Sequence, residues 1–388
     1  MRKFDAGSTR RTRRLPGLLL LFVAALVLAA GCGGDDGGGS GSGEGSIWVL
    51  LPDSATSPRW ESDDRRYFTQ AFEDAGVEFN IVNAEGDAAQ QQSQAEQAIA
   101  DGASVILLVS NDTGSGATII DNAKDSDVQV VEYDRFNTGG SGGAAYVSFD
   151  NVEVGRTMGR ELEPAIDALN KPKPRVVMLN GGEEDNNSFL FRTGYNETVE
   201  KRVNAGDWEL VADQHVPGWD NQQAQTIMEQ ILTSADNKVD AVFAANDGLA
   251  NSAINAMEAA GIQQAPVSGQ DATVAGIQNI LLGKQTMTVY KPIQAEADLA
   301  AAVALALRNG EDLESVESDA EFNLIGIKAE DGNPSEESSG DGIVPYFALT
   351  PIGVTADNIQ DTVIADGFRT KKEVCTGDTA QTEFCKSS

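Results

Sequence analysis

Polar residues with strong hydrogen-bonding side chains follow several apolar runs in this 388-residue sequence. The clearest case is VVEYDRFN (130–137), in which two valines precede the adjacent opposite charges Asp134 and Arg135. A carboxylate accepts several hydrogen bonds and a guanidinium donates in a planar fork, so such a pair can hold neighbouring hydroxyl groups of one ligand. An incidental ion pair on a solvated loop is the alternative. The same pattern recurs at Asp53, Asn246–Asp247, Gln270–Asp271 and Lys291.

These residue types favour a neutral, hydroxyl-rich ligand such as a sugar. Charge-assisted hydrogen bonds contribute roughly 1.5–3 kcal/mol each, so several of them outweigh the cost of immobilising a small ligand. Trp60 and Trp219 stand beside polar clusters and could cover the apolar C–H faces of a sugar ring. A tryptophan that only packs in the core is the alternative for each.

Other chemistries find little support in the composition. His215 is the single histidine, which leaves no basis for a histidine-rich metal site or a Ser-His-Asp triad. The segment GGSGG (139–143) fits GxSxG only formally, and no glycine-rich nucleotide motif follows an apolar run, so we expect no metal and no cofactor. With 28 Lys and Arg against 60 Asp and Glu, the net charge of −32 excludes nucleic acid as a partner.

Alternating strand and helix patterns must position the polar residues. Apolar runs that predict strands alternate with amphipathic segments from Ile47 onward, which is typical of parallel sheets covered by helices on both faces. A second series of the same kind follows the first, and the two meet near Val147–Val154. The predicted strands lie at 47–53, 77–84, 104–110, 128–134, 175–182, 208–216, 239–247, 265–271 and 286–293. Ligands of such sheets bind outside the carboxyl ends of the strands, where the polar residues stand.

The N-terminus predicts export. Arginines at 10–14 precede an apolar run, Leu18–Ala30, that is too short to span a bilayer comfortably and ends in LAAGC. We expect residues 1–31 to be a lipoprotein signal peptide, with Cys32 lipidated; ordinary signal-peptidase cleavage is the alternative. The paired arginines leave both the general secretory and the twin-arginine route open. Residues 33–46 are rich in Gly and Ser, which predicts a flexible tether.

Two cysteines lie near the C-terminus, Cys375 and Cys385. Outside the cytosol, cysteines this close in sequence favour a disulfide, and their spacing differs from the CxxC of redox proteins. We expect a tail over residues 373–388 that carries this disulfide.

An ordered set of motifs resembles the periplasmic sugar-binding proteins of ABC transporters, of the type I fold, and most of all their D-xylose-binding branch. The resemblance extends from Ile47 to Phe368, and no single motif carries it alone. The matching segments include SPRW (57–60), YDR (133–135), SFDN (148–151), DNN (185–187), GW (218–219), ND (246–247), SGQDA (268–272), TMTVYKPI (286–293) and DTVIADGF (361–368).

The resemblance implies an α/β fold of two doubly wound parallel-sheet lobes joined by a three-crossover hinge. The N-terminal lobe would comprise residues 47–149 and 292–345, and the C-terminal lobe residues 150–291 and 346–372. Residues 32–46 would be the lipidated cysteine and its tether. The implied ligand-binding residues are Arg59, Trp60, Asp134, Arg135, Asn186, Asn187, Trp219, Asn246, Asp271 and Lys291.

The sequence departs from this family pattern in three places. The segment ESDDRR (61–66) follows Trp60, where the xylose proteins usually have a lysine, and this bears on which sugar is bound. The acidic segment 330–341 and the tail from residue 373 have no counterpart in the pattern, and we expect both at the surface.

The implied function is an exported, lipid-anchored protein that captures a monosaccharide, D-xylose first and then arabinose, glucose or galactose. It would act as a monomer, without enzyme activity, and deliver the sugar to an ABC import permease. One alternative is a sensor that presents its closed form to a receptor. A second is a glycosidase with paired carboxylates, although among 60 acidic residues some pair always lies close. A sugar-responsive repressor is excluded, because the expected lipoprotein signal segment, which ends at Cys32, occupies the place where such a repressor has its DNA-binding helices.

Overall fold

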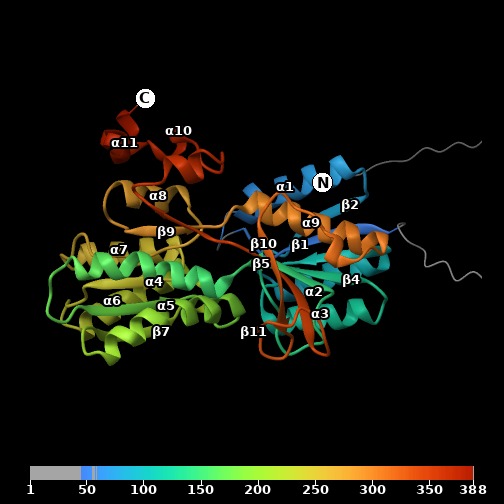
Figure 1. Cartoon of the computed structure of the whole chain (residues 1–388), viewed down its shortest axis with the longest axis horizontal. Coiled ribbons are helices and arrows are strands. Elements are labelled where there is room, and N and C mark those ends of the chain that lie inside the picture. The colour runs from blue at the N-terminus through green and yellow to red at the C-terminus, as the bar shows by residue number, and fades with distance from the viewer. Residues whose placement is uncertain (1–44, 55–56, 58, 388) are drawn as a thin grey trace, which may run out of the picture. The chain divides into compact units, whose positions relative to one another are not determined.

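The structure, a computed structural model, describes residues 45–54, 57 and 59–387. The expected signal peptide, Cys32 and most of the expected tether lie outside the described residues. The described chain forms two α/β lobes (Figure 1). Among the described residues, none of the helices is both long and apolar enough to cross a membrane.

The first lobe is built on a mainly parallel sheet with strand order β11-β10-β12-β5-β4-β3-β1-β2. Strands β1 and β3 are almost wholly buried, which explains why they read as continuous apolar runs. Helices α1 and α9 pack together on one side and α2 and α3 on the other (Figure 1). The elements are β1 (Ser46–Leu51), α1 (Arg65–Ala75), β2 (Phe79–Asn83), α2 (Ala88–Ala100), β3 (Ala103–Leu108), α3 (Thr113–Lys124), β4 (Gln129–Tyr133), β5 (Ala145–Phe149), α9 (Ile293–Asn309), β10 (Phe322–Lys328), β11 (Pro334–Ser335) and β12 (Ile343–Leu349).

The second lobe contains the parallel sheet β7-β6-β8 and the antiparallel pair β13-β9. The segment 267–270 connects these two sheets through single bridges. Val267 pairs with Val242 of β8, and Gln270 pairs with Val289 of β9. Helices α4 and α5 pack against each other, as do α6 and α7. The elements are α4 (Asn151–Asp167), β6 (Arg175–Asn180), α5 (Asn186–Asn204), β7 (Glu209–His215), α6 (Asn221–Ser234), β8 (Ala241–Ala244), α7 (Asp247–Ala259), α8 (Val274–Leu281), β9 (Met287–Tyr290) and β13 (Ile352–Thr355).

The doubly wound α/β architecture predicted from the sequence is confirmed, but the strands differ from the predicted set. The structure adds strands that were not predicted, namely β5, β10, β11, β12 and β13. The strand expected at 265–271 is reduced to the two bridges, because the segment pairs with β8 only at Val267 and then with β9 only at Gln270. Directly after it, the backbone turns into left-handed conformations at Asp271 and Ala272. This turn faces the candidate site described below.

The chain passes between the lobes at Asp150, at Pro292 and between Leu349 and Ile352. The boundary expected between residues 345 and 346 is wrong, because it falls inside β12. Residues Tyr346–Leu349 pair in parallel with Tyr146–Phe149 of the first sheet, so the whole strand belongs to the first lobe. The acidic segment 330–341 belongs to the turn and edge strand that join β10 to β12.

The C-terminal tail packs on the second lobe. A disulfide joins Cys375 and Cys385, and the short helices α10 (Lys371–Val374) and α11 (Glu383–Lys386) flank it. The side chain of Val374 is fully buried in a small core that includes Ile277 of α8. The tail therefore lies on the surface, as expected, but it is anchored to the lobe by apolar packing.

Candidate functional site

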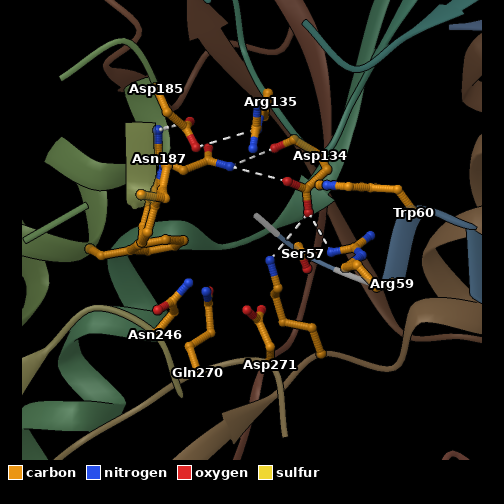
Figure 2. Close-up of a pocket in the computed structure, with 13 residues that line it drawn as sticks. Ser57, Arg59, Trp60, Asp134, Arg135, Asp185, Asn187, Asn246, Gln270 and Asp271 are labelled. Carbon is orange, nitrogen blue, oxygen red and sulfur yellow. Dashed lines mark hydrogen bonds and ion pairs between the residues drawn. The ribbon is translucent and has the colours of Figure 1, made fainter. Parts of the chain in front are cut away.

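A pocket lies between the lobes, beyond the carboxyl ends of the strands (Figure 2). Except for Asn186, every ligand-binding residue expected from the sequence lines it. Asp185, Phe191, Gln270 and Ser57 line it as well and were not among the expected residues. The lining residues are Ser57, Arg59, Trp60, Asp134, Arg135, Asp185, Asn187, Phe191, Trp219, Asn246, Gln270, Asp271 and Lys291.

Asp134, directly after β4, is the centre of the polar network. Its Oδ2 accepts hydrogen bonds from Arg59 Nη1 at 2.8 Å and from Lys291 Nζ at 3.2 Å. Its backbone carbonyl accepts from Asn187 Nδ2 at 2.8 Å and from Ser148 Oγ at 3.0 Å. Burial opposes ionisation, but the charges of Lys291 and Arg59 outweigh it and hold the pKa of Asp134 below its ordinary value. Asp134 is therefore ionised and fixed in place.

Arg59 is largely engaged by the protein itself. It is 5% exposed, and its guanidinium donates to Asp64 through Nε (2.9 Å) and Nη2 (2.8 Å), to Asp134, and to Glu296 Oε2 at 2.8 Å. Of its five N–H groups, one on Nη1 has no acceptor among the residues that the structure describes and can donate to a ligand. Arg59 thus lines the pocket mainly as the group that fixes Asp134.

Two acidic residues that hold Arg59 were missed by the sequence analysis. Glu296 is buried in the apolar helix α9, and Asp64 is buried in the turn before α1. Burial raises the pKa of both, against the attraction of Arg59, and for Glu296 the pKa rises to about 8. A lone glutamate inside the apolar run IQAEADLAAAVALAL was the only available signal, and it does not name its partner.

Arg135 connects the lobes. Its Nη1 donates to the carbonyl of Ser110 in the first lobe at 3.0 Å, and its Nε lies 3.5 Å from Asp185 Oδ2 in the second. Burial raises the pKa of Asp185, although Arg135 opposes this shift. Asp185 also caps α5, because its carboxylate accepts from Asn187 N at 2.9 Å.

Aromatic rings supply the apolar part of the pocket. The guanidinium carbon of Arg59 lies 4.3 Å from the ring centre of Trp60, which is 2% exposed. Trp219 adopts a left-handed backbone (φ 54°), unusual for so large a side chain, and packs against Gly181. A Cβ at Gly181 would lie 2.1 Å from the Trp219 ring, so glycine is required there.

Asn246, Gln270 and Asp271 face the charged cluster from the opposite side of the pocket (Figure 2). The Oδ1 of Asn246 accepts from Leu249 N at 2.9 Å and caps α7, which leaves its amide donors. Gln270 is 4% exposed, and its Oε1 has no hydrogen-bond partner among the residues that the structure describes. The pocket therefore offers both donors and acceptors on this side.

Direct contacts between the lobes also occur outside the pocket. Asn186 was expected to contact ligand, but its Nδ2 donates instead to the carbonyl of Gly332, in the acidic segment of the first lobe, at 3.3 Å. Nearby, Thr113 N donates to the carbonyl of Glu184 at 3.1 Å. Asn186 and Asn187 are successive residues at the start of a helix, so their side chains diverge by about 100° and only one faces the pocket.

The described residues offer no other obvious chemistry. They contain no group of three or more His, Cys, Asp and Glu side chains placed to hold a metal ion. The Nδ1 atom of His215, at the end of β7, lies 2.8 Å from the carbonyl oxygen of Gly181, and His215 does not line the pocket. The arrangement can bind a small polar molecule with both hydrogen-bonding and apolar surfaces.

The chain is similar to known binding proteins over most of its length. Residues 48–312 match the family model described as periplasmic binding protein domain. The D-xylose-binding periplasmic protein of Escherichia coli K12 is 36% identical over 317 residues, 81% of this chain and 88% of that protein. The protein of the same name from Haemophilus influenzae Rd is also 36% identical, over 84% and 91% of the two chains.

A solved structure shares the fold as well. An ABC transporter solute binding protein from Clostridium phytofermentans, with bound β-D-glucose, superimposes with a TM-score of 0.73 at 26% identity. The superposition covers 85% of this chain and 99% of that one.

Proposed function

Because this chain belongs to the periplasmic binding protein family, we propose that it binds a monosaccharide in the pocket between its lobes. The observation that carries the proposal is the placement of Asp134. A buried, ionised carboxylate fixed by Arg59 and Lys291, with Trp60 and Trp219 beside it, suits neighbouring hydroxyl groups next to an apolar sugar face.

The proposed ligand contacts come from both lobes. Arg59, Trp60, Asp134 and Arg135 belong to the first lobe, and Asn187, Trp219, Asn246, Asp271 and Lys291 to the second. To these we add Gln270, whose buried Oε1 can accept from a sugar hydroxyl. Asn186 is withdrawn from the set, because its side chain is committed to Gly332.

We propose D-xylose as the first sugar to test. Two relatives that are named for D-xylose are 36% identical over more than four-fifths of this chain. The solved relative with bound glucose supports glucose as an alternative, and arabinose and galactose are the other sugars to test. Micromolar binding corresponds to about 8 kcal/mol, which a few charge-assisted hydrogen bonds can supply after the cost of lobe closure.

Sugar binding would shift an equilibrium between open and closed lobes. Contacts such as Arg135 with Asp185, and Asn187 with the Asp134 carbonyl, join the two lobes and exist only when the cleft is closed. In the proposed role, the closed form docks on an ABC import permease and releases its sugar there. A sensor that hands the closed form to a receptor is the second candidate.

The proposed location is the outer face of the cell membrane, with the protein held by lipid on Cys32 and a tether. The signal-like segment before Cys32 supports this proposal, and so do relatives whose names describe them as periplasmic. Labelling with a radioactive fatty acid in cells tests it, because a Cys32→Ala variant should lose the label.

Calorimetric titration of the purified protein with xylose, arabinose, ribose, glucose and galactose tests the main proposal. We expect micromolar or tighter binding of one sugar, and its loss in Arg135→Ala. Arg156→Ala is the matched control, because Arg156 pairs with Glu197 on an exposed surface of the second lobe. No binding to any of the five sugars would remove the monosaccharide assignment.

A further inference from the structure

Asp247 is a buried carboxylate next to the pocket that the proposed binding mode does not use. It directly follows the pocket residue Asn246 and begins α7, yet it does not line the pocket and is 1% exposed. A buried acid must be satisfied by partners to be tolerated. Its partners show what it does.

Hydrogen-bond donors converge on both oxygens of Asp247. Oδ1 accepts from Gln285 Nε2 and from Thr288 Oγ1, each at 2.8 Å. Oδ2 accepts from Thr273 N at 2.8 Å and from Thr273 Oγ1 at 3.0 Å. The backbone N of Asp247 donates to the carbonyl of Gln270 at 3.0 Å. Asp247 therefore holds both ends of the segment Gln270–Thr273.

The surrounding backbone leaves room for this carboxylate and for little else. A Cβ at Gly269 would lie 2.2 Å from Asp247 Oδ1, and a Cβ at Gly276 would lie 2.1 Å from Oδ2. Real side chains do not tolerate such approaches, so glycine at both positions is needed to bring the segment against Asp247.

The segment that Asp247 holds is strained. Asp271 has φ 95° and Ala272 has φ 45°, left-handed conformations that non-glycine residues rarely adopt. Ala272 N donates to Thr288 Oγ1 at 3.2 Å, and that hydroxyl in turn donates to Asp247. The strained turn is thus tied to Asp247 directly through Thr273 and indirectly through Thr288.

This turn carries two residues into the pocket. Gln270 and Asp271 both line it and face the charged cluster around Asp134 (Figure 2). Without the acceptors of Asp247, the turn can relax toward ordinary backbone angles, and both side chains would then move.

We propose that Asp247 is a positioning residue for sugar binding: it holds the turn 270–273 in a left-handed conformation and thereby places Gln270 and Asp271 against the ligand. The inference rests on the proposed function and deepens it. The alternative is a buried acid that contributes to folding and leaves the pocket geometry unaffected.

The variant Asp247→Asn keeps the size of the side chain and replaces one acceptor by an amide donor. The amide NH2 would face either the Thr273 backbone N–H or the Gln285 amide, both of which are donors. We expect the affinity for the sugar that binds the wild-type protein to fall at least tenfold by calorimetry. Asp213→Asn is the control: this half-buried carboxylate of the same lobe pairs with Arg192 and lies outside the pocket. It should leave the affinity unchanged.

Rescue by glycine separates positioning from folding. In the double variant Asp247→Asn/Ala272→Gly, the turn can stay left-handed without a Cβ penalty, so affinity should recover by at least threefold relative to Asp247→Asn alone. The midpoint of thermal unfolding should not recover, because Ala272 is fully buried and its methyl group is lost. Affinity would then recover while stability does not, which a purely structural role does not produce.

Crystal structures of the wild-type protein and of Asp247→Asn complete the test. We expect φ at Asp271 or Ala272 to change sign in the variant, with Gln270 and Asp271 displaced. An unchanged turn, unchanged affinity, or no rescue by Ala272→Gly would each overturn the inference. If the wild-type protein binds none of the sugars, the proposed function fails by itself, and the geometry of the turn in the two structures still decides whether Asp247 holds it.

Discussion

Replacing Asn186 by alanine tests how far contacts outside the pocket contribute to sugar affinity. Its Nδ2 donates across the lobes to the Gly332 carbonyl at 3.3 Å, so in the proposed opening and closing of the lobes this bond would break when the lobes move apart. A neutral hydrogen bond contributes about 0.5–1.5 kcal/mol net. If sugar binding is coupled to closure as proposed, loss of this hydrogen bond should weaken affinity by roughly 2- to 12-fold.

The pattern across sugars distinguishes this mechanism from direct contact. If Asn186 acts only through closure, Asn186→Ala should weaken every sugar that binds by the same factor, since the pocket itself is unchanged. If it touched the ligand, sugars that differ at one hydroxyl would lose affinity unequally. Calorimetric titration with at least two sugars that bind supplies the comparison.

Two glycines, Gly332 in the acidic segment and Gly342 directly after it, provide the matched control. Gly332 has φ 67°, and a Cβ there would lie 2.5 Å from the Asn186 amide, so Gly332→Ala should hinder closure. Gly342 has φ 71° but nothing within 4 Å of an added Cβ, so Gly342→Ala carries the backbone strain alone. Only Gly332→Ala should weaken sugar binding. Equal effects of the two variants, or unchanged affinity in Asn186→Ala, would refute the closure mechanism.

Three further predictions concern stability and the pocket wall. Burial raises the pKa of Glu132 to about 7, so the folded state keeps a proton that the unfolded chain loses from about pH 4.5, and stability should fall by roughly 3 kcal/mol between pH 4.5 and 7. Urea unfolding across this pH range should show that fall, and Glu132→Gln should abolish part of it. The fall should remain in 0.5 M salt, which screens the charges of the acidic surface. Replacing the disulfide cysteines Cys375 and Cys385 by serine should remove roughly 2–3 kcal/mol, confined to the tail in hydrogen exchange, and leave sugar affinity unchanged. Gly181→Ala should displace the Trp219 ring and weaken sugar binding more than tenfold in the same titration, whereas unchanged affinity would contradict the role given to that ring.

Local sequence patterns predicted the strand ends and hence most of the pocket. Asp134, Asn246 and Lys291 each follow a buried apolar strand, and ligands of α/β sheets bind outside the carboxyl ends of the strands. The predictions failed where local pattern carries no information. Whether Asn186 or Asn187 faces the pocket depends on the rotation of α5 and on the position of the acidic segment of the other lobe.

Side-chain partners that lie far apart in the sequence likewise could not be predicted. Glu296 bonds to Arg59 across 237 positions, and nothing near either residue indicates the pairing. The membership of β12 in the first lobe depends on its pairing with β5, a contact between segments about 200 positions apart that the local pattern does not specify. The left-handed turn at Asp271 and Ala272 also could not be predicted from the sequence, because neither residue is the glycine that such backbone angles favour.

Left-handed backbone at three pocket residues indicates that the pocket is shaped during folding. Asp134 (φ 59°), Trp219 (φ 54°) and Asp271 (φ 95°) each stand at the end of a strand or turn that is otherwise regular. Such conformations cost about 1–3 kcal/mol each and persist only where surrounding bonds hold them. That cost is met by the folded lobes, so little ordering remains when a sugar arrives. Affinity should therefore be governed by lobe closure and by the bonds that hold each lobe's binding groups, and the variants at Asn186 and Asp247 address these two contributions separately.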